Sequence, residues 1–466
     1  MLFTSASFFI LLLVTFILYY LPFFSRLQIH LLIIASLIFY AYEQPILLLL
    51  LLFSATINIV TSYYVIYGPA DKKKIIALAG VIFNICILSF FKYSPLFART
   101  LLNNEGSIAN LLLKIPLPIG ISFFTFEGIS LVIDAYKEKF FKETSQIPVS
   151  LVRHAKRTIF FISFFPHLIS GPILKAHDFL PQIKQKHLKD IDWDFCFKNL
   201  ILGYFLKMVV ADNLKDFTFW MRYPSFQAFS SLSLLTMLFG YSCQIFADFA
   251  GYSIIAIGMA KLFGYDFIAN FNFPYISTSF SEFWRRWHIS LSSFLKEYLY
   301  IPLGGNRKGK LRTYINLLIT MFLGGLWHGA AWSYAIWGTF HGVALAIERL
   351  YKDNLRVKST KFTNVICGIF VFSLVSLGWL FFKLSNIHHV AEFLKNVASN
   401  YAYRDNAQII TYIILYSSPV VFYHIFYLLK WQKITTQKYD YIFYGIMLFF
   451  ILINSGSPGA FIYFQF

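Results

Sequence analysis

The sequence predicts an all-α protein that crosses a membrane many times. Of its 466 residues, 58% are hydrophobic and 20% are aromatic, and the mean hydropathy is +0.62. These values exclude an ordinary soluble domain. A helix needs about 20 apolar residues to span a bilayer, and apolar runs recur along the whole chain. We therefore expect a single membrane domain over residues 1–466.

Ten apolar runs mark the expected helices. Three of them, 28–66, 228–264 and 313–347, are long enough to hold two passes or a broken pair each. This pattern predicts about ten to thirteen transmembrane helices. The first run lacks a basic leading region and is too long for a signal peptide, so we expect it to remain as a span. The runs cover residues 5–24, 28–66, 75–91, 157–174, 196–211, 228–264, 313–347, 363–383, 407–429 and 440–454.

Two more polar segments are expected at the membrane surface. Residues 175–194 indicate an amphipathic or loop segment. Residues 270–312 mix Trp and Tyr with Arg and Lys, which is typical of the headgroup level. Within the second segment, Pro274 and Pro302 bracket an expected interfacial helix over residues 279–300.

This interfacial helix carries the first group of candidate functional residues. Ser279 or Ser281 is expected to cap its start, with Glu282 in the first turn. A helix that only lies on the membrane, with its Arg reaching lipid phosphates, would show the same pattern. Four of its polar residues, spaced three or four apart, are expected to share one face: Ser281, Arg285, His288 and Ser292.

The net charge of +18 comes from short basic clusters between the apolar runs. Loop-confined Lys and Arg are what the positive-inside rule predicts for cytoplasmic connections, so we expect no nucleic-acid partner. A secondary role in holding anionic membrane lipid or a phosphorylated cofactor stays open. The four cysteines are isolated, and their spacing fits neither a metal site nor a disulfide framework. We therefore expect each to be a small buried hydrophobic residue.

His328 lies in a stretch, residues 313–347, that contains no Lys, Arg, Asp or Glu. An imidazole placed that deep in apolar sequence loses its hydration, so its default interpretation is functional. Three glycines around it would let backbone or substrate approach closely. They are Gly324, Gly325 and Gly329. His341 follows in the same run and is a candidate supporting residue.

Other polar residues also occur in apolar sequence. Asp248 is the only charge between Arg222 and Lys261, and intramembrane acids usually pair with a partner. For Asp248, a structural role with an Arg or a Tyr hydroxyl as its partner is as consistent with the sequence as a catalytic role. Glu127 and Asp134 are expected to be structural, since they could lie at surface depth.

The histidines favour proton transfer over metal binding. His288, His328 and His341 could ligate zinc, but no HxxxH or HExxH spacing supports it, so we expect no metal. An imidazole near neutral pH can take a proton from a hydroxyl. No GxSxG, SxxK or Walker pattern offers a covalent serine or a phosphate loop. General-base chemistry on a hydroxyl is therefore favoured.

A proton-coupled transporter is the competing hypothesis from a different class. In it, His328 and Asp248 would form a proton relay. The chain shows no repeated halves and no paired broken helices of the kind that transporters use. This weakens the transporter hypothesis without removing it.

Long strings in this chain resemble a known family. SFSEFWRRWHISLSSFLKEYLYIPLGGNRKG and NLLITMFLGGLWHGAAWSYAIWGTFHG closely resemble the signature of the membrane-bound O-acyltransferase (MBOAT) family. The similar branch is the bacterial one that includes alginate O-acetyltransferases. The strings PLPIGISFFTFEGISLVIDAY, FFPHLISGPI and DFAGYSIIAIGMAKLFGYDFIANFNFPY match the same branch. The resemblance runs from about residue 116 to 342, the expected catalytic core.

The resemblance implies an all-helical fold with roughly a dozen spans around a central funnel. It implies an acetyl transferase in the bacterial inner (cytoplasmic) membrane, with acetyl-CoA, or a thioester made from it, as donor. The acceptor would be a hydroxyl of a cell-envelope polysaccharide, either peptidoglycan or an alginate-like exopolysaccharide; D-alanyl transfer to teichoic acid is an alternative within the family. A separate extracytoplasmic partner of the SGNH esterase type would be expected.

Applied residue by residue, the resemblance makes His328 the catalytic residue and His288 the second functional histidine. His328 would act as general base on the acceptor hydroxyl. Trp327 and Trp332 would help to exclude water, with Asp248 and His341 in supporting roles. Basic residues could hold the CoA phosphates, although the positive-inside rule accounts for them equally well. They are Arg285, Arg286, Arg307, Lys308 and Lys310.

Overall fold

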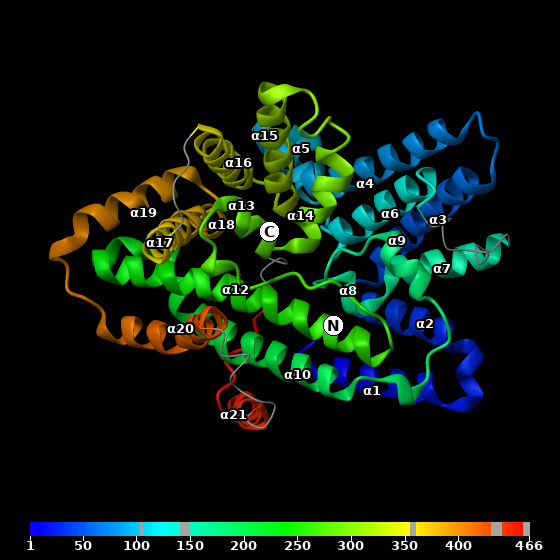
Figure 1. Cartoon of the computed structure of the whole chain (residues 1–466), viewed down its shortest axis with the longest axis horizontal. Helices are drawn as coiled ribbons and strands as arrows, with labels where there is room; N and C mark the ends of the chain where they lie inside the picture. The colour runs from blue at the N-terminus through cyan, green and yellow to red at the C-terminus, as the bar shows by residue number, and fades with distance from the viewer. Residues whose placement is uncertain (103–105, 140–149, 355–359, 430–439, 460–466) are drawn as a thin grey trace. The chain divides into compact units, whose positions relative to one another are not determined.

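A computed structural model describes most of the chain, and Figure 1 shows its helices. Every regular element in the described ranges is helical, which confirms the predicted all-α class. The chain forms two compact units: a first unit of residues 1–199 with 256–268, and a second unit of residues 200–255 with 269–466. The single membrane domain stays a prediction. The described residues are 1–102, 106–139, 150–354, 360–429 and 440–459.

The first unit is built around long apolar helices joined by buried polar groups. Asn58 and Asn84, on α3 and α4, exchange side-chain hydrogen bonds of 3.2 and 2.8 Å. Gly128 of α6 lies against them, because a Cβ there would be 2.5 Å from the Asn58 Nδ2. Amide pairs and small residues join helices well in a bilayer. The helices of this unit are α1 (Ala6–Tyr20), α2 (Gln28–Ala41), α3 (Pro45–Tyr67), α4 (Lys73–Leu101), α5 (Gly106–Leu113), α6 (Ile121–Tyr136), α7 (Leu151–Ser163), α8 (Phe165–Leu168) and α9 (Ala176–Phe179).

Two acid–histidine pairs tie the segment after α7 along α6. The Glu127 Oε1 lies 2.8 Å from the Nδ1 of His167, and both side chains are fully buried. Further along α6, the Asp134 Oδ2 lies 2.7 Å from the Nδ1 of His177. These acids therefore have structural partners, as predicted for them.

The second unit contains the candidate site. The unit boundary falls inside two helices, α10 (Trp193–Tyr204) and α12 (Ser231–Leu262). A π-helical segment, Phe205–Ala211, follows α10. The remaining helices of this unit are α11 (Asp212–Thr218), α13 (Phe280–Arg286), α14 (Ile289–Leu295), α15 (Gly309–His328), α16 (Trp332–Asn354), α17 (Lys361–Gly378), α18 (Leu380–Lys383), α19 (Ile387–Ser399), α20 (Ala407–Leu428) and α21 (Asp440–Ile453).

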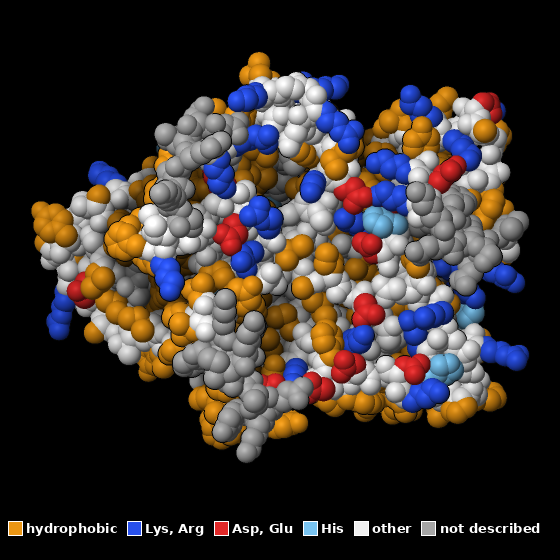
Figure 2. Space-filling model, in the orientation of Figure 1, with side chains coloured by type: hydrophobic (Ala, Val, Ile, Leu, Met, Phe, Trp, Pro, Cys, Tyr) orange, Lys and Arg blue, Asp and Glu red, His pale blue; other side chains and the backbone are white. Residues whose placement is uncertain are grey.

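Six described helical segments are long and apolar enough to cross a membrane. The apolar stretch of α12 is 89% buried, whereas the other five bury only 28–39% of theirs. Their remaining faces expose Leu, Ile and Phe, as helices facing lipid do, and Figure 2 shows such side chains over much of the face in view. The six are Pro22–Ala41, Pro45–Tyr67, Lys73–Leu101, Ser231–Leu262, Lys361–Lys383 and Ala407–Leu428.

The long apolar runs resolve in two ways. Residues 28–66 form α2 and α3, and residues 313–347 fall in α15 and α16, so each holds the predicted pair. Residues 228–264 do not: α12 is one continuous helix of 32 residues. This run contains no proline. Other apolar runs form shorter apolar helices such as α1 and α21, so length and composition alone support six spans within the described ranges, and the predicted ten to thirteen would include shorter helices.

Candidate active site

His328 is the last residue of α15, and its imidazole lies inside an aromatic enclosure. Its side chain is only 3% exposed. The ring centroids of Trp327, Trp337 and Phe382 each lie 5.1 Å from the centroid of the imidazole. Such an enclosure limits the water around the imidazole, which favours proton transfer from a bound reactant.

A close crossing of α15 and α16 holds this enclosure in place. A Cβ on Gly325 would lie 2.2 Å from the carbonyl oxygen of Tyr334, and one on Gly338 would lie 2.2 Å from that of Met321. Only glycine permits this backbone approach. The glycines near His328, predicted to allow close approach, therefore bring α16 and its Trp337 against the imidazole.

His288 lies at a break in the chain and not within a continuous helix. Trp287 is extended (φ −103°, ψ 129°) and His288 is left-handed (φ 44°, ψ 54°), so α13 ends at Arg286 and α14 begins at Ile289. The predicted helix over residues 279–300 is therefore wrong. Its predicted common face is wrong too, because the break changes the direction of the side chains that follow it.

The break brings the two histidines together. The imidazole centroids of His288 and His328 lie 6.2 Å apart. Phe249 of α12 stands edge-on to His288 at 4.6 Å, and Trp327 packs against both imidazoles. Asn270 contacts the turn itself, with its Oδ1 3.4 Å from the Nδ1 of His288.

A cavity of about 120 Å³ opens beside His328. Its walls are mainly apolar, and its polar lining includes Ser292, Lys296 and Tyr300. Lys296 is exposed, so the cavity reaches the surface of the second unit there. Two of its lining residues, Leu295 and Gly324, pack closely, because a Cβ on Gly324 would lie 3.0 Å from the Leu295 Cδ1. The lining residues are Trp284, Leu291, Ser292, Leu295, Lys296, Tyr300, Thr320, Met321, Gly324, His328, Trp337 and Leu345.

His341 is the third buried histidine of this region. It is fully buried, and its ring centroid lies 4.8 Å from Trp337 and 5.3 Å from Trp284. Phe283 stacks on it at an interplanar angle of 11°. Trp337 thus packs against both His328 and His341, which links the third histidine to the site through one aromatic ring.

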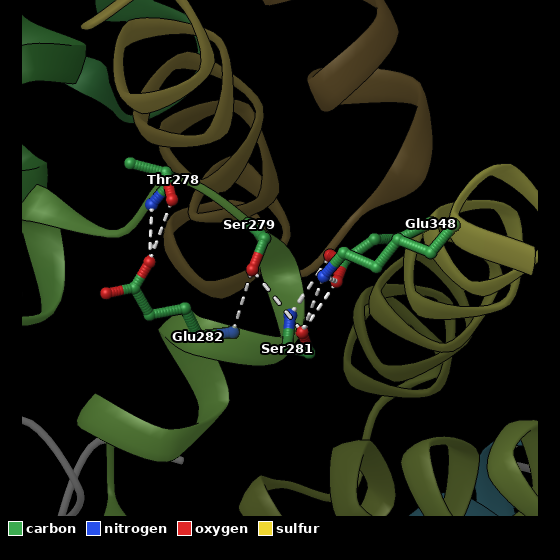
Figure 3. A network of polar contacts seen from close by, with 6 residues as sticks. Thr278, Ser279, Ser281, Glu282 and Glu348 are labelled. Atoms are coloured by element: carbon green, nitrogen blue, oxygen red, sulfur yellow. Dashed lines mark hydrogen bonds and ion pairs between the residues drawn. The ribbon is translucent and has the colours of Figure 1, made fainter. Parts of the chain in front are cut away.

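A polar network fixes the start of α13 (Figure 3). The Ser279 hydroxyl accepts a hydrogen bond from the Glu282 backbone N–H at 3.2 Å, which confirms Ser279 as the cap. The Glu282 carboxylate in turn accepts hydrogen bonds from the backbone N–H and the hydroxyl of Thr278, at 2.9 and 3.0 Å. These reciprocal bonds satisfy the open end of the helix.

Glu348 ties this helix start to α16. Its carboxylate accepts hydrogen bonds from the Ser281 N–H (3.1 Å) and hydroxyl (2.5 Å), and Lys352 approaches to 2.5 Å. Burial alone would raise the pKa of Glu348, but the hydrogen bonds from Lys352 and Ser281 outweigh it and hold the pKa below its usual value. Glu348 lies outside the six candidate spans. The ionised form is thereby favoured, which anchors α13 ahead of the His288 turn.

The predicted phosphate-binding residues lie in two separate places. Arg286 is occupied by the protein, since it donates to the Glu282 carboxylate (3.0 Å) and to the Asn272 carbonyl (2.9 Å), whereas Arg285 is exposed. The other basic residues are exposed around the start of α15, a rise of about 27 Å along the helix from His328. They are Arg307, Lys308 and Lys310.

The predicted supporting residues differ in their placement. Trp327 is 3% exposed and touches His328, but Trp332 is 49% exposed at the start of α16. Asp248 belongs to a buried ion cluster: the Lys207 Nζ lies 2.7 Å from both Asp248 Oδ1 and Asp212 Oδ1. Lys207 is therefore a partner of Asp248, where an arginine or a tyrosine hydroxyl was expected. The cluster ties α12 to the π-helical segment 205–211.

With this geometry in place, similarity to known proteins decides the family. The profile of the MBOAT, or membrane-bound O-acyltransferase, family matches residues 112–387, more than half of the chain. The chain belongs to the MBOAT family. It is therefore a multi-pass membrane O-acyltransferase, and the predicted enzyme class is confirmed.

The relatives of this MBOAT chain include two named O-acetylating proteins. It is 34% identical over 439 residues to a peptidoglycan O-acetyltransferase of Helicobacter pylori, with 85% of this chain and 81% of the relative covered. It is 39% identical over 399 residues to a probable alginate O-acetylase, AlgI, of Pseudomonas aeruginosa, covering 83% and 73%. A teichoic acid D-alanyltransferase of Bacillus subtilis is 29% identical over 58% of this chain and 70% of its own length.

Some of the MBOAT site was not found from the sequence. Trp337, Phe382, Lys296 and Asn270 were not singled out, although all four contact a histidine or line its cavity. Asn270 had a detectable signal, because it is an amide in the string DFIANFNFPY ahead of the RRWH motif. The other three depend on how α14, α16 and α18 pack, which no local pattern reveals.

Proposed function

We propose that this MBOAT chain transfers an acetyl group from acetyl-CoA, or a thioester made from it, to a hydroxyl of a cell-envelope polysaccharide. One observation carries the proposal: His288 and His328 share an enclosed aromatic site, with ring centroids 6.2 Å apart.

The proposed reaction needs one base and no covalent enzyme intermediate. His328 takes the proton from the acceptor hydroxyl as its oxygen attacks the thioester carbonyl carbon. A C–O bond forms and the C–S bond breaks. The proton then passes from the imidazole to the departing CoA thiolate, which leaves as the free thiol. The products are an O-acetyl ester and CoA.

The size of the cavity supports a short acyl group. A cavity of about 150 Å³ lined by apolar side chains is known to hold a benzene molecule, and the cavity beside His328 measures about 120 Å³. An acetyl group fits such a volume, whereas a long fatty acyl chain does not. The apolar walls also favour an alkyl group over a sugar.

The names of the relatives support the proposed class of acceptor. Their names describe O-acetylation of peptidoglycan and of alginate, and we propose one of these polysaccharide classes as the acceptor. The enzyme would lie in the bacterial inner (cytoplasmic) membrane and work with a separate extracytoplasmic SGNH-type acetyltransferase. Arg285, Arg307, Lys308 and Lys310 would hold CoA phosphates.

The test replaces the base. His328→Ala should lower the release of CoA thiol from acetyl-CoA by at least about 100-fold in proteoliposomes, because a general base contributes about 10²–10⁴-fold. His424→Gln is the matched control, since His424 is a buried histidine hydrogen-bonded to the Val420 carbonyl. Full activity of His328→Ala would overturn the mechanism.

A further inference from the structure

We propose that Asn270 is a positioning residue that sets both the orientation and the tautomer of His288. The inference rests on the proposed role of His288 in acetyl transfer. Asn270 is 1% exposed and lies in the segment between α12 and α13.

Asn270 holds the turn through its backbone and its side chain. Its carbonyl oxygen accepts a hydrogen bond from the Ile289 N–H at 2.9 Å. Its Oδ1 accepts from the Ser290 hydroxyl at 2.6 Å and from the Ser290 N–H at 3.3 Å. Its Nδ2 donates to the Ser253 hydroxyl of α12 at 3.0 Å. One side chain thus joins α12 to the first residues of α14.

These contacts determine which way the amide faces. A backbone N–H only donates, so the atom facing Ser290 must be the amide oxygen. The same oxygen lies 3.4 Å from the Nδ1 of His288. The amide oxygen of Asn270 can only accept a hydrogen bond, so the Nδ1 that faces it carries the hydrogen. In neutral His288, the lone pair is therefore on Nε2.

The backbone conformation of His288 supports a positioning role for Asn270. A non-glycine residue at φ 44° is strained, and such strain persists where surrounding contacts impose it, often at functional sites. The Asn270 contacts with Ile289 and Ser290 impose it here. Without them, the imidazole would leave its position beside His328.

The tautomer limits what His288 can do. A lone pair on Nε2 accepts a hydrogen bond from a hydroxyl, but it repels the oxyanion that forms on the thioester carbonyl. His288 therefore orients or activates a hydroxyl and does not stabilise the oxyanion. The rings packed against it come from Phe249 of α12 and from Trp327 and His328 of α15, and among these the imidazole of His328 is the ionisable group.

Two variants of Asn270 separate positioning from simple structural support. Asn270→Ala removes the acceptor, so kcat for CoA release from acetyl-CoA should fall by about 100-fold while KM changes little. Asn270→Asp keeps an acceptor but adds a negative charge that favours the protonated imidazole. The acidic side of the pH–activity profile of Asn270→Asp should therefore move to higher pH by about one pH unit or more.

Ser253→Ala is the matched control, because it removes a partner of the Asn270 amide without touching His288. It should keep most of kcat and the parental pH profile. If Asn270→Ala loses no more activity than Ser253→Ala, or if the Asn270→Asp profile does not move, Asn270 does not position His288. If His288→Ala keeps full activity, the proposed function of His288 fails instead. Should Asn270→Ala not fold, the Asn270→Asp pH profile decides.

Discussion

His288 adopts a left-handed backbone (φ 44°) that costs a non-glycine residue about 1 kcal/mol or more. Neighbouring hydrogen bonds offset that cost, among them the bond from the Ile289 N–H to the Asn270 carbonyl. His328 needs no such strain, because it ends a regular helix and is held by ring contacts. The two histidines are thus positioned by different physical means.

Individual basic residues can also be compared as binding sites for the phosphates of the acyl donor. Lys296 lines the cavity beside His328, whereas Arg307, Lys308 and Lys310 lie at the far end of α15. Replacing the latter three together by Gln should raise KM for acetyl-CoA about tenfold with kcat unchanged, if they bind phosphate. Initial rates over a range of acetyl-CoA concentrations measure this.

Lys296→Gln tests the alternative position. If the phosphates bind near the cavity mouth, this single change should raise KM more than the triple change does. An unchanged KM in the triple variant would remove Arg307, Lys308 and Lys310 from donor binding and leave them to membrane topology.

The sequence revealed single residues unevenly. His328 was identifiable because a polar ring in uncharged apolar sequence is costly, and Ser279 because caps have a local signature. The break at His288 was not identifiable. The string from Ser279 to Tyr300 contains no glycine or proline, and the break depends on hydrogen bonds that Ile289 and Ser290 donate to Asn270, which is far outside one helical turn.

Among the elements, α14 and α15 set the width of the cavity. The Leu295 Cδ1 packs against Gly324, where a Cβ would lie only 3.0 Å from it. Both residues line the space beside His328. The contact between these helices should therefore determine which acyl groups fit.

Leu295→Ala removes three carbons from the cavity wall and should raise the ratio of butyryl-CoA to acetyl-CoA turnover by about tenfold or more, since each added methylene in an apolar pocket is worth about 10- to 200-fold. Gly324→Ala should do the opposite and disfavour propionyl-CoA. Turnover of acetyl-, propionyl- and butyryl-CoA by each variant measures the effect.

Leu318→Ala serves as the control for that series. Leu318 is on α15 and packs against Gly342 of α16, outside the cavity lining. It should leave the chain-length profile unchanged even where it lowers stability. A parental profile in Leu295→Ala would show that the acyl group binds elsewhere.

Element boundaries were predictable where the chain carries a local stop. The three residues Gly329, Ala330 and Ala331 separate α15 from α16, and the pair was expected. α12 shows the opposite case, since its 32 residues extend about 48 Å. Its interior glycines pack against neighbours, as Gly240 does against Ile413. Only tertiary contacts distinguish such a helix from a broken pair.

For the whole molecule, composition and long motifs were sufficient to predict an all-α membrane enzyme of the MBOAT family. The division into two compact units was not predicted, because it depends on contacts between residues far apart in sequence. The acceptor could not be predicted in this way, because relatives named for peptidoglycan and for alginate are similarly close to this chain, at 34% and 39% identity.

The acceptor can be identified by mass spectrometry of the cell envelope. Deleting the gene should remove base-labile acetyl groups from either peptidoglycan or an exopolysaccharide, and the wild-type chain or His424→Gln should restore them. His328→Ala should not restore them, because it lacks the proposed base. D-alanine esters on teichoic acid should be unchanged. Unaltered acetylation of both polysaccharides in the deletion strain would contradict acetyl transfer to the envelope, and loss of D-alanine esters would favour the other branch of the family.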